Sequence, residues 1–163
     1  MKLVVFDILA MDLSDFFKTR TQAYDFSTRL AAISESIYQT DFNLEKTLME
    51  QLGIKKSDKF MTFLRDNKVD TESPAALKEF LNKIKNTITA LPTLSLTLAF
   101  EPREQTLQAL AEWFILQTKT QVLFDITVDP KLIAGAAINF KGKYLDFSIK
   151  PTFDKILSET TTK

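Results

Sequence analysis

Three aspartates near the C-terminal end of the chain are the residues whose type and spacing could do chemistry. They are Asp125, Asp129 and Asp146. Paired carboxylates serve in acid–base catalysis, and carboxylate oxygens are ligands that Mg²⁺ prefers. A structural role is the stronger interpretation, because Asp129 precedes a proline and is placed to cap the following turn with its side chain. We therefore expect no catalytic, metal-binding or cofactor-binding residue.

The composition closes most other routes to catalysis. The chain has no Cys and no His, which excludes thiol catalysis, disulfides and the commonest general base and metal ligand. Its three glycines are isolated, so the sequence contains neither the P-loop motif GxxxxGK[ST] nor the dinucleotide-binding motif GxGxxG. Basic and acidic residues balance at 21 each, which argues against a nucleic-acid partner.

The first 13 residues, MKLVVFDILAMDL, resemble a signal peptide only superficially. Asp7 interrupts the apolar run, and no small-residue cleavage pattern follows. No segment approaches the roughly 20 apolar residues of a membrane-spanning helix. We expect a soluble, cytoplasmic protein that does not insert into the membrane.

The stretch Asp129–Ser148 predicts a loop or short helical turn followed by a β-hairpin. A two-residue turn at Lys141 and Gly142 would place Phe140 opposite Lys143, Ile138 opposite Leu145 and Ala136 opposite Phe147. This register sorts the hairpin into an apolar face and a mostly polar face. Gly142 supplies the positive φ of the turn, and Gly135 stands where a side chain would collide with packed neighbours.

The elements around this stretch predict a small mixed-sheet module over residues 91–163. Alternating residues indicate strands at 94–100 and 122–128, with a helix between them that starts with Pro102 at its first position. Strand, helix and strand with short connections favour a right-handed crossover and a parallel pair. The hairpin adds two antiparallel strands, and Pro151 begins a closing amphipathic helix.

Residues 1–90 predict a small helical bundle. The longest pattern runs from Asp12 to about Gln39, as one helix of about seven turns or as two helices. Its stripe repeats every seven residues: Phe16, Ala23, Leu30 and Ile37. The stripe is either the core of the bundle or a partner-binding surface.

Three shorter helices complete the predicted bundle. One follows an N-cap at Asp41 or Asn43 and ends at Gly53, and the next opens at Ser57. The last has Ser73 as N-cap and Pro74 at its first position. The fold class is therefore α+β: a helical bundle over 1–90, then a β-α-β unit, a hairpin and a closing helix over 91–163.

Residues 119–157 carry a set of residues in a characteristic order. Asp129 and the pair Leu132-Ile133 are followed by Ala134-Gly135 before a strand, then by the hairpin. The full set is Asp129, Leu132, Ile133, Gly135, Gly142, Asp146 and Ser148. In this order and spacing the stretch resembles the C-terminal domain of the F-type ATP synthase δ subunit, whose mitochondrial counterpart is the oligomycin-sensitivity-conferring protein (OSCP). The family usually has Gly-Gly where Ala134-Gly135 stands.

The resemblance implies a non-catalytic stator subunit of the peripheral stalk, acting in ATP synthesis coupled to proton transport. The bundle would grip the N-termini of α subunits, and the module would hold the C-termini of b subunits. Such a protein is a monomer within a hetero-oligomer, peripheral at the inner face of the membrane. Two other hypotheses remain: a stand-alone adaptor that binds partner helices, and a carboxylate enzyme or small-molecule binder.

Overall fold

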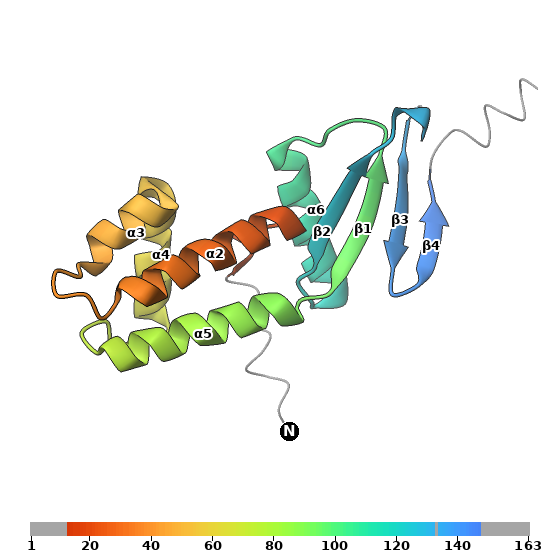
Figure 1. The fold of residues 1–163 in the computed structure, drawn as a ribbon. Coiled ribbons are helices and arrows are strands. Elements are labelled where there is room, and N and C mark those ends of the chain that lie inside the picture. The colour runs from red at the N-terminus through yellow and green to blue at the C-terminus, as the bar shows by residue number, and fades with distance from the viewer. Residues whose placement is uncertain (1–12, 133, 148–163) are drawn as a thin grey trace, which may run out of the picture. The chain divides into compact units, whose positions relative to one another are not determined.

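The computed structural model describes residues 13–132 and 134–147 (Figure 1). Helices come first and a small sheet follows, so the predicted α+β class is confirmed. The elements are α2 (Arg20–Ser36), α3 (Leu44–Leu52), α4 (Ile54–Asp66), α5 (Pro74–Ala90), β1 (Thr93–Leu98), α6 (Glu104–Thr118), β2 (Leu123–Val128), the 3-10 turn η1 (Pro130–Leu132), β3 (Ala136–Phe140) and β4 (Lys143–Asp146). The closing helix predicted from Pro151, and the positions Ile133 and Ser148, lie outside the described residues.

Residue contacts divide the chain into two units. We call the first the bundle: it holds the described residues through Phe17 and those of Thr21–Leu91. The second, the module, holds Lys18–Arg20 together with the described residues from Pro92 onward. The sequence places a boundary between residues 90 and 91, and the units divide between Leu91 and Pro92. The inclusion of Lys18–Arg20 in the module has no counterpart in the predicted domains.

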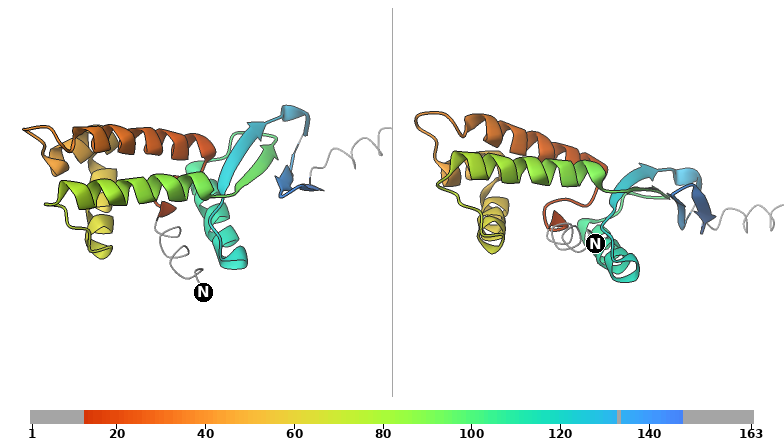
Figure 2. Two further views of the ribbon diagram at one scale, coloured as in Figure 1. Left: turned by 60° about the horizontal axis from the view of Figure 1, so that its bottom comes forward. Right: turned by 90° about the horizontal axis from the view of Figure 1, so that it is seen from below.

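The bundle is held by an aromatic core. In both views of Figure 2, α2 and α5 run side by side. The ring of Phe16 stacks on Phe26 at 5.2 Å between centroids, and Phe60 meets Phe16 edge-on at 5.7 Å. Phe63 extends the cluster to Phe80 at 5.7 Å. Offset and edge-on aromatic contacts of this kind add to the free energy of burial.

Of the two alternatives for residues 12–39, one continuous helix is wrong, because the pattern is broken. The chain is non-helical from Ser14 to Thr19, and the regular helix α2 spans Arg20–Ser36. The break has a tertiary cause: Thr19 forms a parallel bridge with Phe124, whose amide nitrogen donates to the Lys18 carbonyl oxygen at 2.9 Å. Pairing with a distant strand has overridden a local helical pattern.

The capping predictions hold for α3 and α5. The Asn43 side chain accepts from the Lys46 amide at 2.9 Å, and the Ser73 side chain accepts from the Ala76 amide at 3.4 Å, with Pro74 opening α5. The start predicted for the intervening helix at Ser57 is wrong. Helix α4 begins at Ile54. Gly53, with φ of 79°, is both the C-cap of α3 and the N-cap of α4, so the two helices follow each other without a loop.

The module is built on one sheet of four strands in the order β2-β1-β3-β4. Strand β1 pairs in parallel with β2 and antiparallel with β3, so the predicted parallel pair and mixed sheet are confirmed. Helix α6 connects β1 to β2. It begins at Glu104 after Arg103 as N-cap, which corrects the prediction of Pro102 at its first position.

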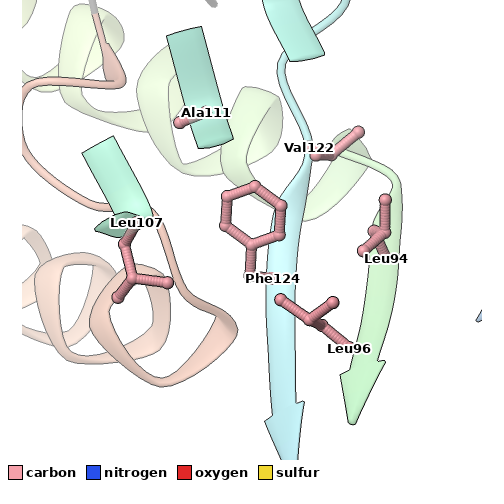
Figure 3. Packing of buried hydrophobic residues seen from close by; sticks show 6 residues of the cluster. All are labelled: Leu94, Leu96, Leu107, Ala111, Val122 and Phe124. Carbon is pink, nitrogen blue, oxygen red and sulfur yellow. The ribbon is translucent and has the colours of Figure 1, made fainter. Parts of the chain in front are cut away.

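The core of the module lies between α6 and one face of the sheet (Figure 3). Phe124 on β2 is at its centre. Around it lie buried side chains from β1, from α6 and from the residue just before β2: Leu94, Leu96, Leu107, Ala111 and Val122. On the far side of β1, Phe140 of β3 meets Phe114 of α6 edge-on, with 5.4 Å between ring centroids. Helix α6 therefore covers β2, β1 and part of β3.

The hairpin has the predicted register. Phe140 pairs with Lys143 and Ile138 with Leu145. The turn residues Lys141 and Gly142 both have positive φ, 50° and 77°. Two positive φ values are typical of the type I′ turn, whose twist matches that of paired strands. Only the glycine of this pair was expected to take a positive φ, so the conformation of Lys141 is an addition to the prediction.

Candidate functional site

The three aspartates considered for catalysis or metal binding lie at a turn, in an exposed ion pair and at a strand end. The Asp129 carboxylate accepts a hydrogen bond from the Lys131 amide at 3.0 Å and so caps the turn η1, as the sequence predicts. The Asp125 carboxylate lies 3.7 Å from the Arg20 guanidinium, and both side chains are exposed. Asp146 is the last residue of β4. Nowhere in residues 13–132 and 134–147 do three acidic side chains gather closely enough to hold a metal ion.

Several residues of the characteristic set, Asp129 to Ser148, lie in the connection from β2 to β3. Leu132 is buried at the end of η1. Gly135 has φ of 94° immediately before β3, a conformation that residues with a Cβ rarely adopt. At Gly142 an added Cβ would meet nothing within 4 Å, so the requirement there is conformational and not steric. The described members of this set therefore act on the path of the backbone between β2 and β4.

The stripe that repeats every seven residues, one interpretation of which is a partner-binding surface, is buried. Phe16, Ala23, Leu30 and Ile37 all lie in the interior of the bundle. This is the core interpretation, and it corrects the partner-surface interpretation of the stripe. A partner would reach these side chains only by displacing helices of the bundle.

Large apolar side chains are exposed at other positions, which sequence reasoning did not select as a site. On α6, Trp113 and Leu116 are 58% and 66% exposed, whereas Leu107, Ala111 and Ile115 are buried. With 3.6 residues per turn, Trp113 and Leu116 lie near the middle of the face opposite that buried stripe. The sequence signal was the extra width of the apolar stripe on this helix, because one side of a helix cannot bury all five residues.

The bundle also exposes apolar side chains. Tyr24 on α2 and Ile54 at the start of α4 are exposed, as is Tyr38, whose ring lies 4.9 Å from the Lys78 ammonium nitrogen. Aromatic residues with one apolar face and one polar tip are frequent in protein interfaces. These side chains are candidates for contact with a partner.

A shallow open hollow of about 460 Å³ lies on the bundle. An ion pair between the Lys59 ammonium and the Asp15 carboxylate, 3.2 Å apart, lies in its wall. The rest of the lining combines polar, acidic and phenyl groups: Ser14, Phe16, Asp58, Thr62, Phe63 and Asp66. An open depression with its lysine already paired lacks the convergent polar groups of a small-molecule site.

Within the part of the chain that the structure describes, no helix combines the length and hydropathy needed to span a bilayer.

Comparison with known proteins gives a family match. The model of the family described as "ATP synthase delta (OSCP) subunit" matches residues 43–159. No curated protein matches the sequence. A similar solved chain comes from the mitochondrial ATP synthase hexamer of Toxoplasma gondii. It is 13% identical with a TM-score of 0.35, over 98% of this chain and 99% of that chain. A TM-score this low carries no weight, so the sequence match is the informative comparison.

Proposed function

Since the chain belongs to the ATP synthase delta (OSCP) subunit family, we propose that it is a non-catalytic stator subunit of the peripheral stalk of an F-type ATP synthase. In this role it links the α/β catalytic head to the b-subunit stalk and keeps the head from turning with the rotor. It contributes to proton-coupled ATP synthesis by transmitting load. The protein is peripheral at the inner face of the membrane and is a monomer within the complex.

The observation that carries the proposal is the extent of the family match. The matched residues, 43–159, begin at the N-cap of α3 and continue beyond β4. They include helices of the bundle as well as the whole described sheet. A match limited to the hairpin would favour an adaptor that shares only the module. The match over both units instead favours a protein whose bundle and module serve the same assembly.

We assign the b-subunit contact to the module. Helix α6 presents Trp113 and Leu116 to solvent, a pair three residues apart that a partner helix could cover. Helix-to-helix docking depends on apolar anchors at such spacing, and tryptophan is enriched among the residues that dominate interface energies. The absence of Cys and His from the sequence is no obstacle to this role, because such contacts require shaped apolar surface and not reactive groups.

We assign the α-subunit contact to the bundle. The core stripe of α2 is occupied by packing within the bundle, so the contact must use exposed side chains of the bundle. Helix α2 precedes the matched residues. We therefore place this contact on the exposed faces of α3, α4 and α5, for example at Ile54.

Affinity purification from native membranes tests the function. The tagged chain is expressed in its own cells, the membranes are solubilised in mild detergent, and bound proteins are identified by mass spectrometry. We expect α, β and b subunits of the synthase to co-purify. We also expect depletion of the chain to leave ATP hydrolysis that no longer drives proton transport. Recovery of a different stable partner without synthase subunits would support the adaptor hypothesis and contradict the stator role.

A further inference from the structure

The outer face of helix α6 carries an exposed stripe with regular spacing. Its members follow one another at intervals of three, four and three residues: Thr106, Ala109, Trp113 and Leu116. All four are exposed, whereas the opposite side of the helix is buried against the sheet. Alternating steps of three and four residues keep a stripe in line with one partner helix, as in coiled coils. These residues, which we call the α6 stripe, therefore fit a single helix packed along α6.

The α6 stripe combines a large side chain with a small one. The Trp113 ring meets the Phe114 ring edge-on at 6.3 Å between centroids, and Phe114 meets Phe140 edge-on at 5.4 Å. These contacts support the Trp113 ring in one position, so it is a preorganised anchor. Ala109 lies one turn earlier, about 6 Å along the helix axis, and carries only a methyl group. The surface is therefore high at Trp113 and low at Ala109.

The flanks of the α6 stripe carry no basic residue. Helix α6 contains neither Lys nor Arg from Glu104 to Thr118. Glu104 is paired with Lys18, whereas Glu112, next to the stripe, is exposed and accepts a hydrogen bond from the Gln108 amide at 2.6 Å. Glu112 forms no ion pair with any residue that the structure describes. A partner helix with a basic residue on its flank matches this edge in charge.

We infer that the b-subunit helix that covers α6 places a large apolar residue over Ala109, a small residue against Trp113 and a basic residue beside Glu112. The inference rests on the proposed contact between the module and b subunits, and it names the positions that select the partner helix. Packed helices lie about 8–10 Å apart, so a tryptophan on one helix leaves room only for a small residue opposite it. An alanine leaves room for a large one.

Exchanging the two residues tests the shape of the α6 stripe. Ala109→Trp combined with Trp113→Ala keeps the composition of the face but reverses its high and low positions. The tagged variant replaces the parent chain in its own cells, and the ratio of b to α subunits is measured after affinity purification from solubilised membranes. We expect the exchange to lower this ratio about tenfold or more. An unchanged ratio would mean that the contact depends on apolar area alone, and it would overturn the inference.

The single change Ala109→Trp separates shape from area more sharply. It adds apolar surface to the face, so a contact that depended only on area would become stronger. Filling the low position should instead weaken recovery of b subunits at least as much as the exchange does. A raised ratio of b to α subunits would refute the inference. Both variants change exposed positions only, so their melting temperatures should stay close to that of the parent chain.

The charge of the partner helix has its own test. Glu112→Lys should lower the ratio of b to α subunits about three- to tenfold, because it replaces attraction by repulsion, and the matched control Glu112→Gln should lower it less. Equal ratios for Glu112→Lys and the parent chain would contradict a basic residue at this place. Failure of the proposed function gives a different result: the parent chain itself would then recover no b subunit, and the inference would fall with it.

Discussion

The Lys18 ammonium donates a 2.9 Å hydrogen bond to the Glu104 carboxylate, which lies 86 positions later in the chain. Lys18 is buried, whereas the Glu104 side chain is largely exposed. The pair joins the segment Lys18–Arg20 to the first turn of α6, within the module. A buried ammonium is costly unless charged or polar groups compensate it, so this contact matters more than a surface ion pair.

We expect Glu104→Gln to lower the free energy of unfolding by about 1–2 kcal/mol, because a neutral amide oxygen is a weaker acceptor for the buried ammonium than a carboxylate. Urea unfolding followed by circular dichroism measures the change. Asp15→Asn is the control, since its ion pair with Lys59 is exposed on both sides. The control should cost less than about 0.5 kcal/mol. Equal costs for the two variants would contradict the importance of burial.

Replacing Gly142 should lower the stability of the protein through backbone conformation alone. Its φ is 77°, and an added Cβ would meet no atom within 4 Å. We expect Gly142→Val to cost about 1–2 kcal/mol and Gly142→Asn clearly less, because asparagine tolerates the left-handed region. Melting temperatures of the two variants provide the measurement. A valine variant that melts like the parent protein would show that the turn adopts another conformation in solution.

Phe60 should be among the most sensitive positions of the bundle. It is fully buried and contacts the rings of Phe16, Phe26 and Phe63. We expect Phe60→Ala to cost about 3–5 kcal/mol through lost burial and an unfilled cavity. Phe100→Ala, at an exposed position, should change the stability by no more than about 0.5 kcal/mol. A cost below about 1 kcal/mol at Phe60 would mean that the aromatic cluster is loosely packed.

The exposed face of α6 should bind a partner without contributing to folding. We expect the double change Trp113→Ala with Leu116→Ala to weaken recovery of b subunits by about tenfold or more, since a buried aromatic anchor is worth about 2 kcal/mol or more. The melting temperature of the isolated chain should stay nearly unchanged. Gln105→Ala, also exposed on α6, is the matched control. Unchanged recovery of b subunits would place their contact elsewhere.

The sequence predicted the elements whose determinants are local. The hairpin register follows from alternation across a two-residue turn, and the parallel pair of β1 and β2 follows from the short connections on either side of α6. The caps at Asn43 and Ser73 depend on one side chain and an amide three residues later. The turn and cap signals are each contained within a few neighbouring residues, and the parallel pair requires only one strand-helix-strand unit; each appears in the structure.

The features that the sequence did not predict have distant causes. The break before α2 arises because Lys18 and Thr19 pair with Phe124, a residue far along the chain. Burial is also ambiguous in a sequence, because apolar core and apolar surface have the same composition. Ile37 was therefore a candidate surface residue and is buried, whereas Trp113 lies on an apolar helix and is exposed. Only the positions of other elements distinguish the two.

The bridge between Thr19 and Phe124 also determines how the protein can be divided. In the sheet order β2-β1-β3-β4, strand β2 is an outer strand, and the Lys18–Arg20 segment lies along its open side. A fragment that starts at Pro92 would lack this segment and would leave the Phe124 amide without its Lys18 partner on the outer edge of β2. Exposed strand edges promote aggregation. Recombinant production of the C-terminal half by itself therefore calls for residues 18–20, joined through a linker at its N-terminus.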